Sequence, residues 1–301
     1  MIKGLKNWRL ILLILIYNGF AFALTGQKRL KLPTSLNENS GLVFINADSC
    51  WWINDSDNEA ELILTNSNGK DVRIYSLQGT NTDWEDLSQD DMGNLFIGDI
   101  GDNARKRSSY KFYKYDPSTK SLDSILFKYG GNQSVSHDCE SFVWFENTLH
   151  LFTKGAVDKK DFICNHYSVD DHTTIQNSKL RGSINLKPFV VTGACISPDG
   201  KTLALLSYRY KFVLGILPDT DSRIYFFEIG DSLETVFRRP IGYYTLPTWL
   251  TTRQYESIDF IDSNHLMLGA EKTAFLKPMI RKIKIPGKLK SWSRQTNFQL
   301  D

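Results

Sequence analysis

Short hydrophobic runs recur along the chain, and each begins just after a polar residue. Examples are the run LeuValPhe soon after Ser40 and the run PheValTrpPhe soon after Glu140. The polar residues recur at intervals of about 45 to 64 residues, and the runs between them have the length of β-strands. Repeats of this size with several short strands each are typical of β-propellers. The sequence therefore predicts an all-β fold, a single five-bladed propeller, with these five head residues at equivalent places in the blades: Ser40, Glu85, Glu140, Thr192 and Glu256.

A second set of polar residues follows the head residues at a nearly constant distance of about 14 residues. Between the two sets lie a hydrophobic strand, a tight turn such as 91–94 or 197–200, and a returning strand. Both sets should therefore lie at the same end of the central channel, although alternating strands can also expose polar residues at regular intervals by themselves. The second set comprises Asn54, Asp55, Asp99, Lys154, Tyr208 (beside Ser207) and Glu271.

The outer strands decide how the propeller closes. The last repeat has no outer strand of its own, and segment 29–32 stands before Ser40 much as the other outer strands stand before their next head. We expect this N-terminal strand to complete the last blade, which leaves fewer bare sheet edges, in a domain spanning 27–301. The long interval from Thr192 to Glu256 leaves six blades as the alternative. Other strands are expected at 61–65, 72–77, 110–115, 124–129, 162–169, 180–187, 223–229, 235–239 and 279–285.

The first 23 residues have the pattern of a signal peptide. Basic residues from Lys3 to Arg9 precede a hydrophobic segment at 10–17, and Ala21 to Ala23 fits a cleavage site. The hydrophobic segment is short for a membrane span, so an uncleaved anchor is the alternative. We therefore expect a secreted or periplasmic protein without a membrane span once the signal is removed.

Charge and cysteine content narrow the expectations further. The formal net charge of +2 gives no electrostatic reason to expect binding to nucleic acid. Nothing in the sequence requires a second subunit, and a monomer is expected. The four cysteines permit two disulfides in any of three pairings, but buried free thiols are at least as plausible in a propeller of this size.

The head residues form a set of oxygen ligands. Three carboxylates that face a narrow channel repel one another unless a cation or protons neutralise them. Carboxylate and hydroxyl oxygens suit calcium better than zinc. We therefore expect a calcium ion on the propeller axis, held by Ser40, Glu85, Glu140, Thr192 and Glu256. In the alternative, the glutamates accept hydrogen bonds from backbone amides and no ion binds.

The segment GlyAspIleGlyAspAsn at 98–103 has the composition of a ligand-binding loop. Its glycines allow a sharp turn that can direct Asp99, Asp102 and Asn103 toward one point, and the basic residue Arg105 follows. The alternative is a turn whose carboxylates bind its own backbone. The expected ligand-binding residues at this end of the channel are Asn54, Asp55, Asn103, Arg105, Lys154, Tyr208 and Glu271.

The order of the head residues resembles that of the soluble calcium-activated nucleotidases, or apyrases. That resemblance implies a five-bladed propeller with calcium on the axis, held by the five head residues, and it departs at Thr192, where the family uses serine. The chain also resembles a group of exported bacterial propellers of unassigned activity, and it departs from them at Ile53, where a histidine is common. The second resemblance is carried by residues 52–56, 83–87, 98–103, 138–154 and 192–208.

Two functions are compatible with these features. In the first, the channel mouth binds a small anionic ligand or a protein partner, because Lys154 and Arg105 stand among carboxylates. In the second, the protein is a calcium-dependent phosphohydrolase in which Asp99 or Asp102 is the catalytic base. We favour binding, because no complete catalytic set is visible in the sequence.

Overall fold

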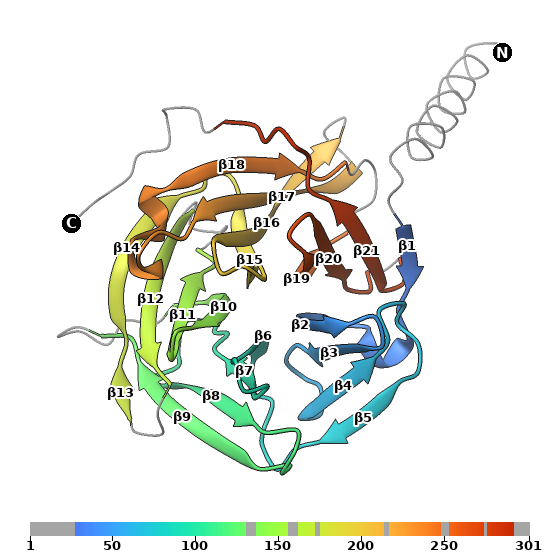
Figure 1. Cartoon of the computed structure of the whole chain (residues 1–301), viewed down its shortest axis with the longest axis vertical. Coiled ribbons are helices and arrows are strands. Elements are labelled where there is room, and N and C mark those ends of the chain that lie inside the picture. The colour runs from blue at the N-terminus through green and yellow to red at the C-terminus, as the bar shows by residue number, and fades with distance from the viewer. Residues whose placement is uncertain are drawn as a thin grey trace.

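Five mainly antiparallel sheets are arranged around a common axis (Figure 1). The computed structural model describes residues 28–130, 137–155, 162–171, 175–213, 217–247, 253–273 and 276–291. The strands are β1 (Lys28–Lys31), β2 (Asn39–Asn46), β3 (Ser49–Asn54), β4 (Glu61–Thr65), β5 (Arg73–Ser76), β6 (Trp84–Gln89), β7 (Leu95–Asp99), β8 (Tyr110–Tyr115), β9 (Leu122–Lys128), β10 (Cys139–Phe145), β11 (Thr148–Thr153), β12 (Ile163–Asp170), β13 (Gln176–Asn177), β14 (Lys179–Asn185), β15 (Val190–Ile196), β16 (Thr202–Val213), β17 (Leu217–Glu228), β18 (Pro240–Thr245), β19 (Tyr255–Asp262), β20 (His265–Ala270) and β21 (Met279–Lys284).

Each sheet is one blade whose strands follow one another outward from the channel. The innermost strands are β2, β6, β10, β15 and β19, and the short strand β13 adds to the outer edge of the second blade, parallel to β9. In the last blade β1 pairs antiparallel with β21, with Lys28 opposite Lys282 and Lys31 opposite Met279. The five-bladed propeller and its closure by the N-terminal strand are therefore confirmed.

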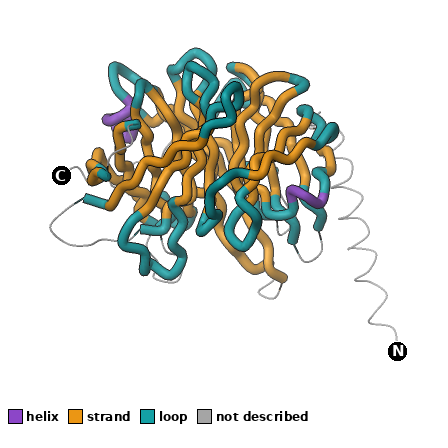
Figure 2. The backbone as a smooth tube through the Cα atoms, turned by 90° about the horizontal axis from the view of Figure 1, so that it is seen from below, coloured by secondary structure: helices purple, strands orange, loops and turns teal. Residues whose placement is uncertain are grey.

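The long interval between the fourth and fifth head residues is filled without a sixth inner strand in the described part of the chain. Strands β16 and β17 have 12 residues each and pair along their whole length, from Thr202 opposite Glu228 to Val213 opposite Leu217. This pair extends past the loops on one face of the disc (Figure 2). The additional residues therefore lengthen one blade.

The strand expected at 235–239 is wrong. These residues belong to a 3-10 helix, η2, at Leu233–Arg238, and the outer strand of the fourth blade is β18 instead. The hydroxyl of Ser232 caps the helix by accepting a hydrogen bond from the amide of Glu234. The helix buries Leu233, Val236 and Phe237, whose spacing of three and four residues is helical. The other short 3-10 helix is η1 at Thr34–Leu36.

The hydrophobic core is divided among the five interfaces between neighbouring blades. Each interface has its own cluster of buried side chains, and Trp52, for example, packs in the cluster that joins the first and last blades. All four cysteines are buried and free, and Cys139 and Cys195 lie on inner strands as expected. The fold therefore depends on hydrophobic packing between blades and not on disulfides.

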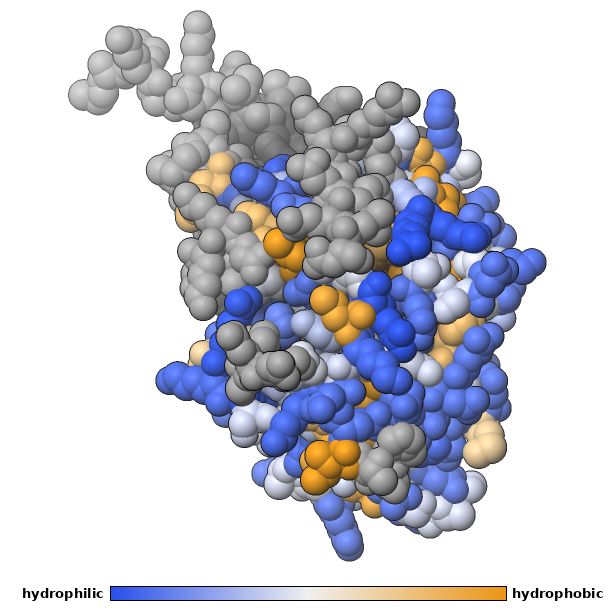
Figure 3. Space-filling view, turned by 90° about the vertical axis from the view of Figure 1, so that its left-hand side faces the viewer, coloured by the Kyte–Doolittle hydropathy of each residue, from blue (hydrophilic) through white to orange (hydrophobic). Residues whose placement is uncertain are grey.

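The signal-peptide prediction concerns residues 1–23, which lie outside the described residues. Within the described part of the chain, no helix is both long and apolar enough to cross a membrane. On the side of the molecule shown in Figure 3, hydrophobic residues are scattered among hydrophilic ones.

Candidate cation site at one mouth of the channel

All five head residues stand at an irregularity of strand pairing. In each inner strand the head residue is the one that the pairing with the next strand skips: for example, Asn39 and Gly41 have partners on β3, whereas Ser40 has none. The same shift surrounds Glu85, Glu140, Thr192 and Glu256. Such β-bulges bend the strand and change the direction of a side chain. The repeat that the sequence shows is therefore a repeated bulge at the start of each inner strand.

The two hydroxyl members of this set join neighbouring blades. The hydroxyl of Ser40 donates a hydrogen bond to the backbone carbonyl of Glu85 in the next blade. The hydroxyl of Thr192 donates to the backbone carbonyl of Tyr255, 3.1 Å away, in the blade after it. Both side chains therefore have a structural role, although their oxygens keep lone pairs.

The second set of polar residues lies at the same end of the channel. Asn54 is paired with Asn39, Asp99 with Trp84, and Tyr208 with Val190, so all three are opposite the beginnings of inner strands. The backbone amides of Lys154 and Glu271 donate hydrogen bonds to the backbone carbonyls of Asp138 and Gln254, which directly precede two of the inner strands. We call this end the acidic mouth, after its carboxylates: Glu38, Asp55, Asp83, Glu85, Asp138, Glu140, Glu256 and Glu271.

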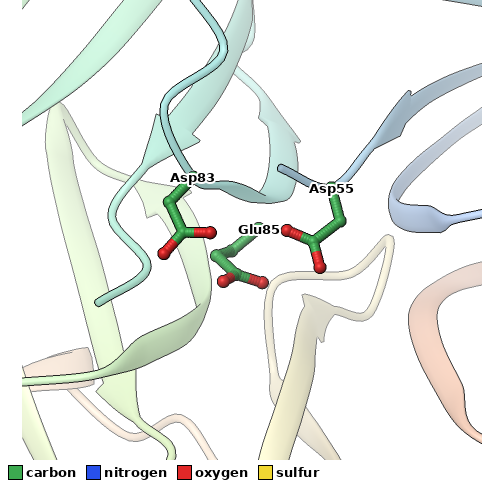
Figure 4. Close-up of side chains that lie close together, drawn as sticks. All are labelled: Asp55, Asp83 and Glu85. Atoms are coloured by element: carbon green, nitrogen blue, oxygen red, sulfur yellow. The ribbon is translucent and has the colours of Figure 1, made fainter. Parts of the chain in front are cut away.

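Five of these carboxylates form one connected cluster on the first three blades. Oxygens of Asp55, Asp83 and Glu85 lie within 4.8 Å of one another, and their side chains point toward a common space (Figure 4). Oxygens of Glu85, Asp138 and Glu140 meet the same limit. Glu85 belongs to both trios and is only 3% exposed, and its Oε1 atom has no hydrogen-bond partner. A buried carboxylate oxygen without a donor is costly unless a cation or a proton compensates it.

The pKa values of this cluster reflect burial and mutual repulsion. Burial, then repulsion from Asp55 and Asp138, raises the pKa of Asp83 to about 6. Burial and the charge of Asp55 raise the pKa of Glu85 well above its usual value. Burial and the charge of Glu256 raise the pKa of Glu271 to about 8. Carboxylates from four blades therefore affect one another's pKa, which indicates that their charges lie close together.

Lys154 provides the positive charge inside the acidic mouth. Its ammonium group is ion-paired with Glu140. Its charge also lowers the pKa of Asp55, Glu85 and Glu256, which belong to the first, second and fifth blades, although burial outweighs this effect in each case. One ammonium group therefore offsets a small part of the negative charge of the mouth.

The glycine-rich loop lies against the cluster through its backbone. A Cβ atom on Gly101 would collide with Oε1 of Glu85 and with the carboxylate of Asp83. The backbone amide of Asp102 donates to Asp138, 3.1 Å away. The expected position of the loop at the channel mouth is therefore correct, and Gly101 leaves room for the two carboxylates.

The loop carboxylates themselves have other partners. Asp99 is fully buried and is ion-paired with Arg107 at 2.8 Å and with Lys111 at 3.6 Å. Asp102 accepts hydrogen bonds from the amides of Lys106 and Arg107 and from the hydroxyl of Tyr110. Asp99 and Asp102 therefore stabilise their own blade and loop, which is the alternative that the sequence left open.

The remaining expected ligand-binding residues divide into two groups. Asn103 is exposed and Arg105 is half-buried at a turn with a φ of 51°, and neither belongs to the two carboxylate trios. Tyr208 is buried, and the charges of Glu256 and Glu271 contribute to raising its pKa after burial itself. Tyr208 therefore belongs to the acidic mouth, whereas Asn103 and Arg105 stand outside the cluster.

Asp83 and Asp138 were missed by the sequence analysis. Each stands two residues before a head glutamate, in AspTrpGlu at 83–85 and AspCysGlu at 138–140. The repeated Asp-x-Glu spacing was visible in the sequence. Alternating residues of a strand point to the same side, so this spacing could have indicated that both carboxylates converge.

Comparisons with known proteins identify no family for this chain. No protein-family model matches the chain, and no curated protein matches it, so the resemblance to apyrases has no support at the level of sequence. Structural similarity extends to a protein assigned provisionally as a gluconolactonase, with 9% identity, a TM-score of 0.46, and coverage of 87% of this chain and 94% of that one.

Two further solved structures have a comparable level of similarity to this chain. The calcium structure of the Trichoderma reesei carbohydrate-active enzyme of family AA12 has 11% identity and a TM-score of 0.46, with 91% of this chain and 85% of that chain covered. Virginiamycin B lyase from Staphylococcus aureus has 10% identity and a TM-score of 0.41, with 87% and 89% covered.

Proposed function

We propose that the acidic mouth binds a hard divalent cation, with calcium as the expected ion, in a protein exported from the cell. The observation that carries this proposal is Oε1 of Glu85, a buried oxygen without a donor that belongs to two trios of carboxylates. The residues fit the ion, because Asp55, Asp83, Glu85, Asp138 and Glu140 offer only oxygen ligands, and calcium takes six to eight of them. Neither trio contains a histidine or cysteine that would favour zinc.

This site differs from the axial ring that the sequence suggested. Glu85 and Glu140 remain candidate ligands, and Asp83 and Asp138 join them. Ser40 and Thr192 hold neighbouring blades together, and Glu256 accepts a hydrogen bond from Gln254 at 3.2 Å. In our proposal the ion lies near the first three blades, away from the fourth.

We propose further that the protein is a binding protein and that the ion holds a small ligand at the mouth. The carboxylates of the acidic mouth outnumber the ammonium group of Lys154, so without a cation the mouth repels anions. An anionic ligand would therefore bind only through the cation. The phosphohydrolase alternative needs a free base near the ion, and the carboxylates proposed for that role, Asp99 and Asp102, have partners of their own.

Thermal unfolding with calcium and with a chelator tests the ion. Ligand at about 100 times its dissociation constant stabilises a protein by about 2.7 kcal/mol, which for a chain of this size is a rise in Tm of about 5 °C or more. Glu85→Gln should abolish the rise, whereas Glu59→Gln, the same change at an exposed position, should preserve it. Thr192→Val should also preserve it, which separates the cluster from the axial ring.

Two results would contradict the proposal. One is a Tm that does not respond to calcium, magnesium or manganese. The other is a calcium response that survives in Glu85→Gln. For the alternative, turnover of nucleotides or simple phosphate esters that disappears in Asp99→Asn would show an enzyme.

A further inference from the structure

A cavity with different chemistry lies at the opposite end of the channel. It has a volume of about 250 Å³, and all five inner strands line it. Its residues lie further along these strands than the head residues: Asp259, for example, comes three residues after Glu256 on β19. Three residues of a strand span about 10 Å, so the cavity is separate from the acidic mouth.

Side chains in this half of the channel satisfy the free edges of the inner strands. The carboxylate of Asp86 accepts hydrogen bonds from the amides of Phe142 and Ala194 at 3.2 and 3.3 Å. The hydroxyl of Ser88 accepts one from the amide of Trp144 at 2.8 Å. Unpaired amides of an inner strand would otherwise be left in the channel without partners.

Asp259 is the carboxylate that lines the cavity. Its Oδ2 atom accepts a hydrogen bond from the amide of Phe44 at 2.7 Å, and its Oδ1 atom accepts one from the amide of Phe260 at 2.8 Å. The residue is half-buried, and among the described residues no lysine or arginine forms an ion pair with it. A carboxylate oxygen that already accepts one hydrogen bond can accept another.

Aromatic residues from three inner strands also line the cavity. Phe44, Trp144 and Phe260 line the cavity together with Asp259. The indole of Trp144 is fixed by a hydrogen bond from its Nε1 atom to Asp171, 2.9 Å away, so it does not need a partner inside the cavity. Aromatic faces attract cations through their quadrupoles, and a nearby carboxylate adds negative charge when it is ionised.

We propose that this cavity binds a small alkylammonium ion, with Asp259 as its counter-ion and Phe44, Trp144 and Phe260 as its walls. A calcium ion does not fit, because it needs six to eight oxygen ligands and the cavity offers one carboxylate among hydrophobic side chains. An anion is repelled by Asp259. Pockets for drug-sized ligands begin at about 300 Å³, so the ligand is smaller than these.

Choline and its uncharged isostere 3,3-dimethylbutan-1-ol provide matched probes. We expect ligand-observed NMR and calorimetry on the calcium-loaded protein to show saturable binding of choline, with the isostere weaker by about tenfold. Asp259→Asn should weaken choline binding by a similar factor, and Trp144→Leu should weaken it while leaving the carboxylate in place. Glu59→Gln should leave choline binding unchanged, because Glu59 is exposed and does not line the cavity.

Each outcome decides the proposal. Equal binding of the two probes, or choline binding that survives in both Asp259→Asn and Trp144→Leu, would overturn it, and so would the absence of choline binding. If Asp259→Asn fails to fold, as circular dichroism would show, the probe pair and Trp144→Leu still give the answer. The result is independent of the ion at the acidic mouth, since the calcium response of Asp259→Asn should equal that of the unmodified protein.

Discussion

At the acidic mouth, carboxylates from four blades lie near one another and Lys154 is ion-paired among them, whereas at the opposite end one carboxylate and three aromatic residues line a cavity. The same five inner strands line both ends. At the acidic mouth each strand has a bulge, and its head residue leaves the regular pairing. At the opposite end β2 and β19 also have pairing irregularities, beyond Phe44 and Phe260, and side chains bind amides of the neighbouring blades. The two ends therefore differ in the partners of their polar side chains.

The carboxylates of the two ends differ in what surrounds them. Burial raises the pKa of Asp259 to about 7, and the hydrogen bonds from the amides of Phe44 and Phe260 oppose this rise. Burial also raises the pKa of Glu85, but there the neighbouring charge of Asp55 adds to the rise. At the opposite end two amide donors therefore partly offset the effect of burial on the carboxylate, whereas at the acidic mouth a neighbouring charge adds to it.

The largest expected effect is a change of stability with pH, and it comes from two histidines outside both ends. It must be subtracted before the stabilities of variants at the two ends are compared at different pH. His150 and His166 on β11 and β12 are buried, and their ring nitrogens are 2.9 Å apart. Burial, with the nearby charge of Arg181, lowers the pKa of His150 to about 3, and burial lowers that of His166 well below its usual value. Below about pH 6.5 the unfolded chain therefore binds protons that the folded chain does not.

This pair should make the protein less stable in acid. Its contribution is fully present above about pH 6.5 and is lost as the pH falls toward 3, which amounts to about 2 to 3 kcal/mol for both rings between about pH 7 and 5.5. Urea unfolding at the two pH values should show this loss in the unmodified protein and a smaller one in the double variant His150→Leu with His166→Phe. Equal losses in both proteins would show that the pair does not titrate in this way.

The next prediction tests how closely the loop at Gly101 packs against the carboxylates of the acidic mouth. Gly101→Ala forces a methyl group against Glu85 and Asp83, so we expect a loss of about 2 kcal/mol of stability together with the calcium response. Gly287→Ala is the matched control, because nothing lies within 4 Å of a Cβ atom there. Urea unfolding and calcium titration measure both quantities. A variant that binds calcium normally would place the ion elsewhere.

The smallest effect concerns the ammonium group of the acidic mouth. Lys154→Met removes a positive charge that repels a divalent cation, and we expect calcium to bind about tenfold more tightly, or about 1.4 kcal/mol. Lys111→Met is the control, since Lys111 pairs with Asp99 at 3.6 Å and stands outside the carboxylate cluster. Weaker calcium binding in Lys154→Met would mean that Lys154 positions Glu140 for the ion. Calorimetry distinguishes these outcomes.

Much of the architecture could be predicted because it depends on a repeated pattern. Head residues such as Glu85 and Glu140 recur at equivalent places, and the missing outer strand of the last repeat pointed to segment 29–32. The error at 235–239 arose from a short segment in which Val236 and Phe237 suit a strand as well as a helix. There the cap at Ser232 and the helical spacing from Leu233 decide the structure.

The candidate site was only partly predictable, because side-chain direction depends on the neighbouring blades. The sequence located the loop at 98–103, but it could not show that Asp99 turns toward Arg107 and Lys111. It also could not show that the head hydroxyls of Ser40 and Thr192 donate to carbonyls of the next blade. These donors and acceptors are 45 and 63 residues apart in sequence, and the packing of neighbouring blades brings them together.

The pairing of β1 with β21 also determines when the molecule can be completed. The ribosome makes Lys28–Lys31 before every other strand and Met279–Lys284 after all of them, yet these two segments lie side by side in one sheet. During synthesis the first strand therefore has no pairing partner until the other four blades have been synthesised. Contacts between such distant segments form late and slowly, because the long loop between them must close first. The ring can close only after synthesis has reached the last strand, so assembly of this propeller is essentially post-translational.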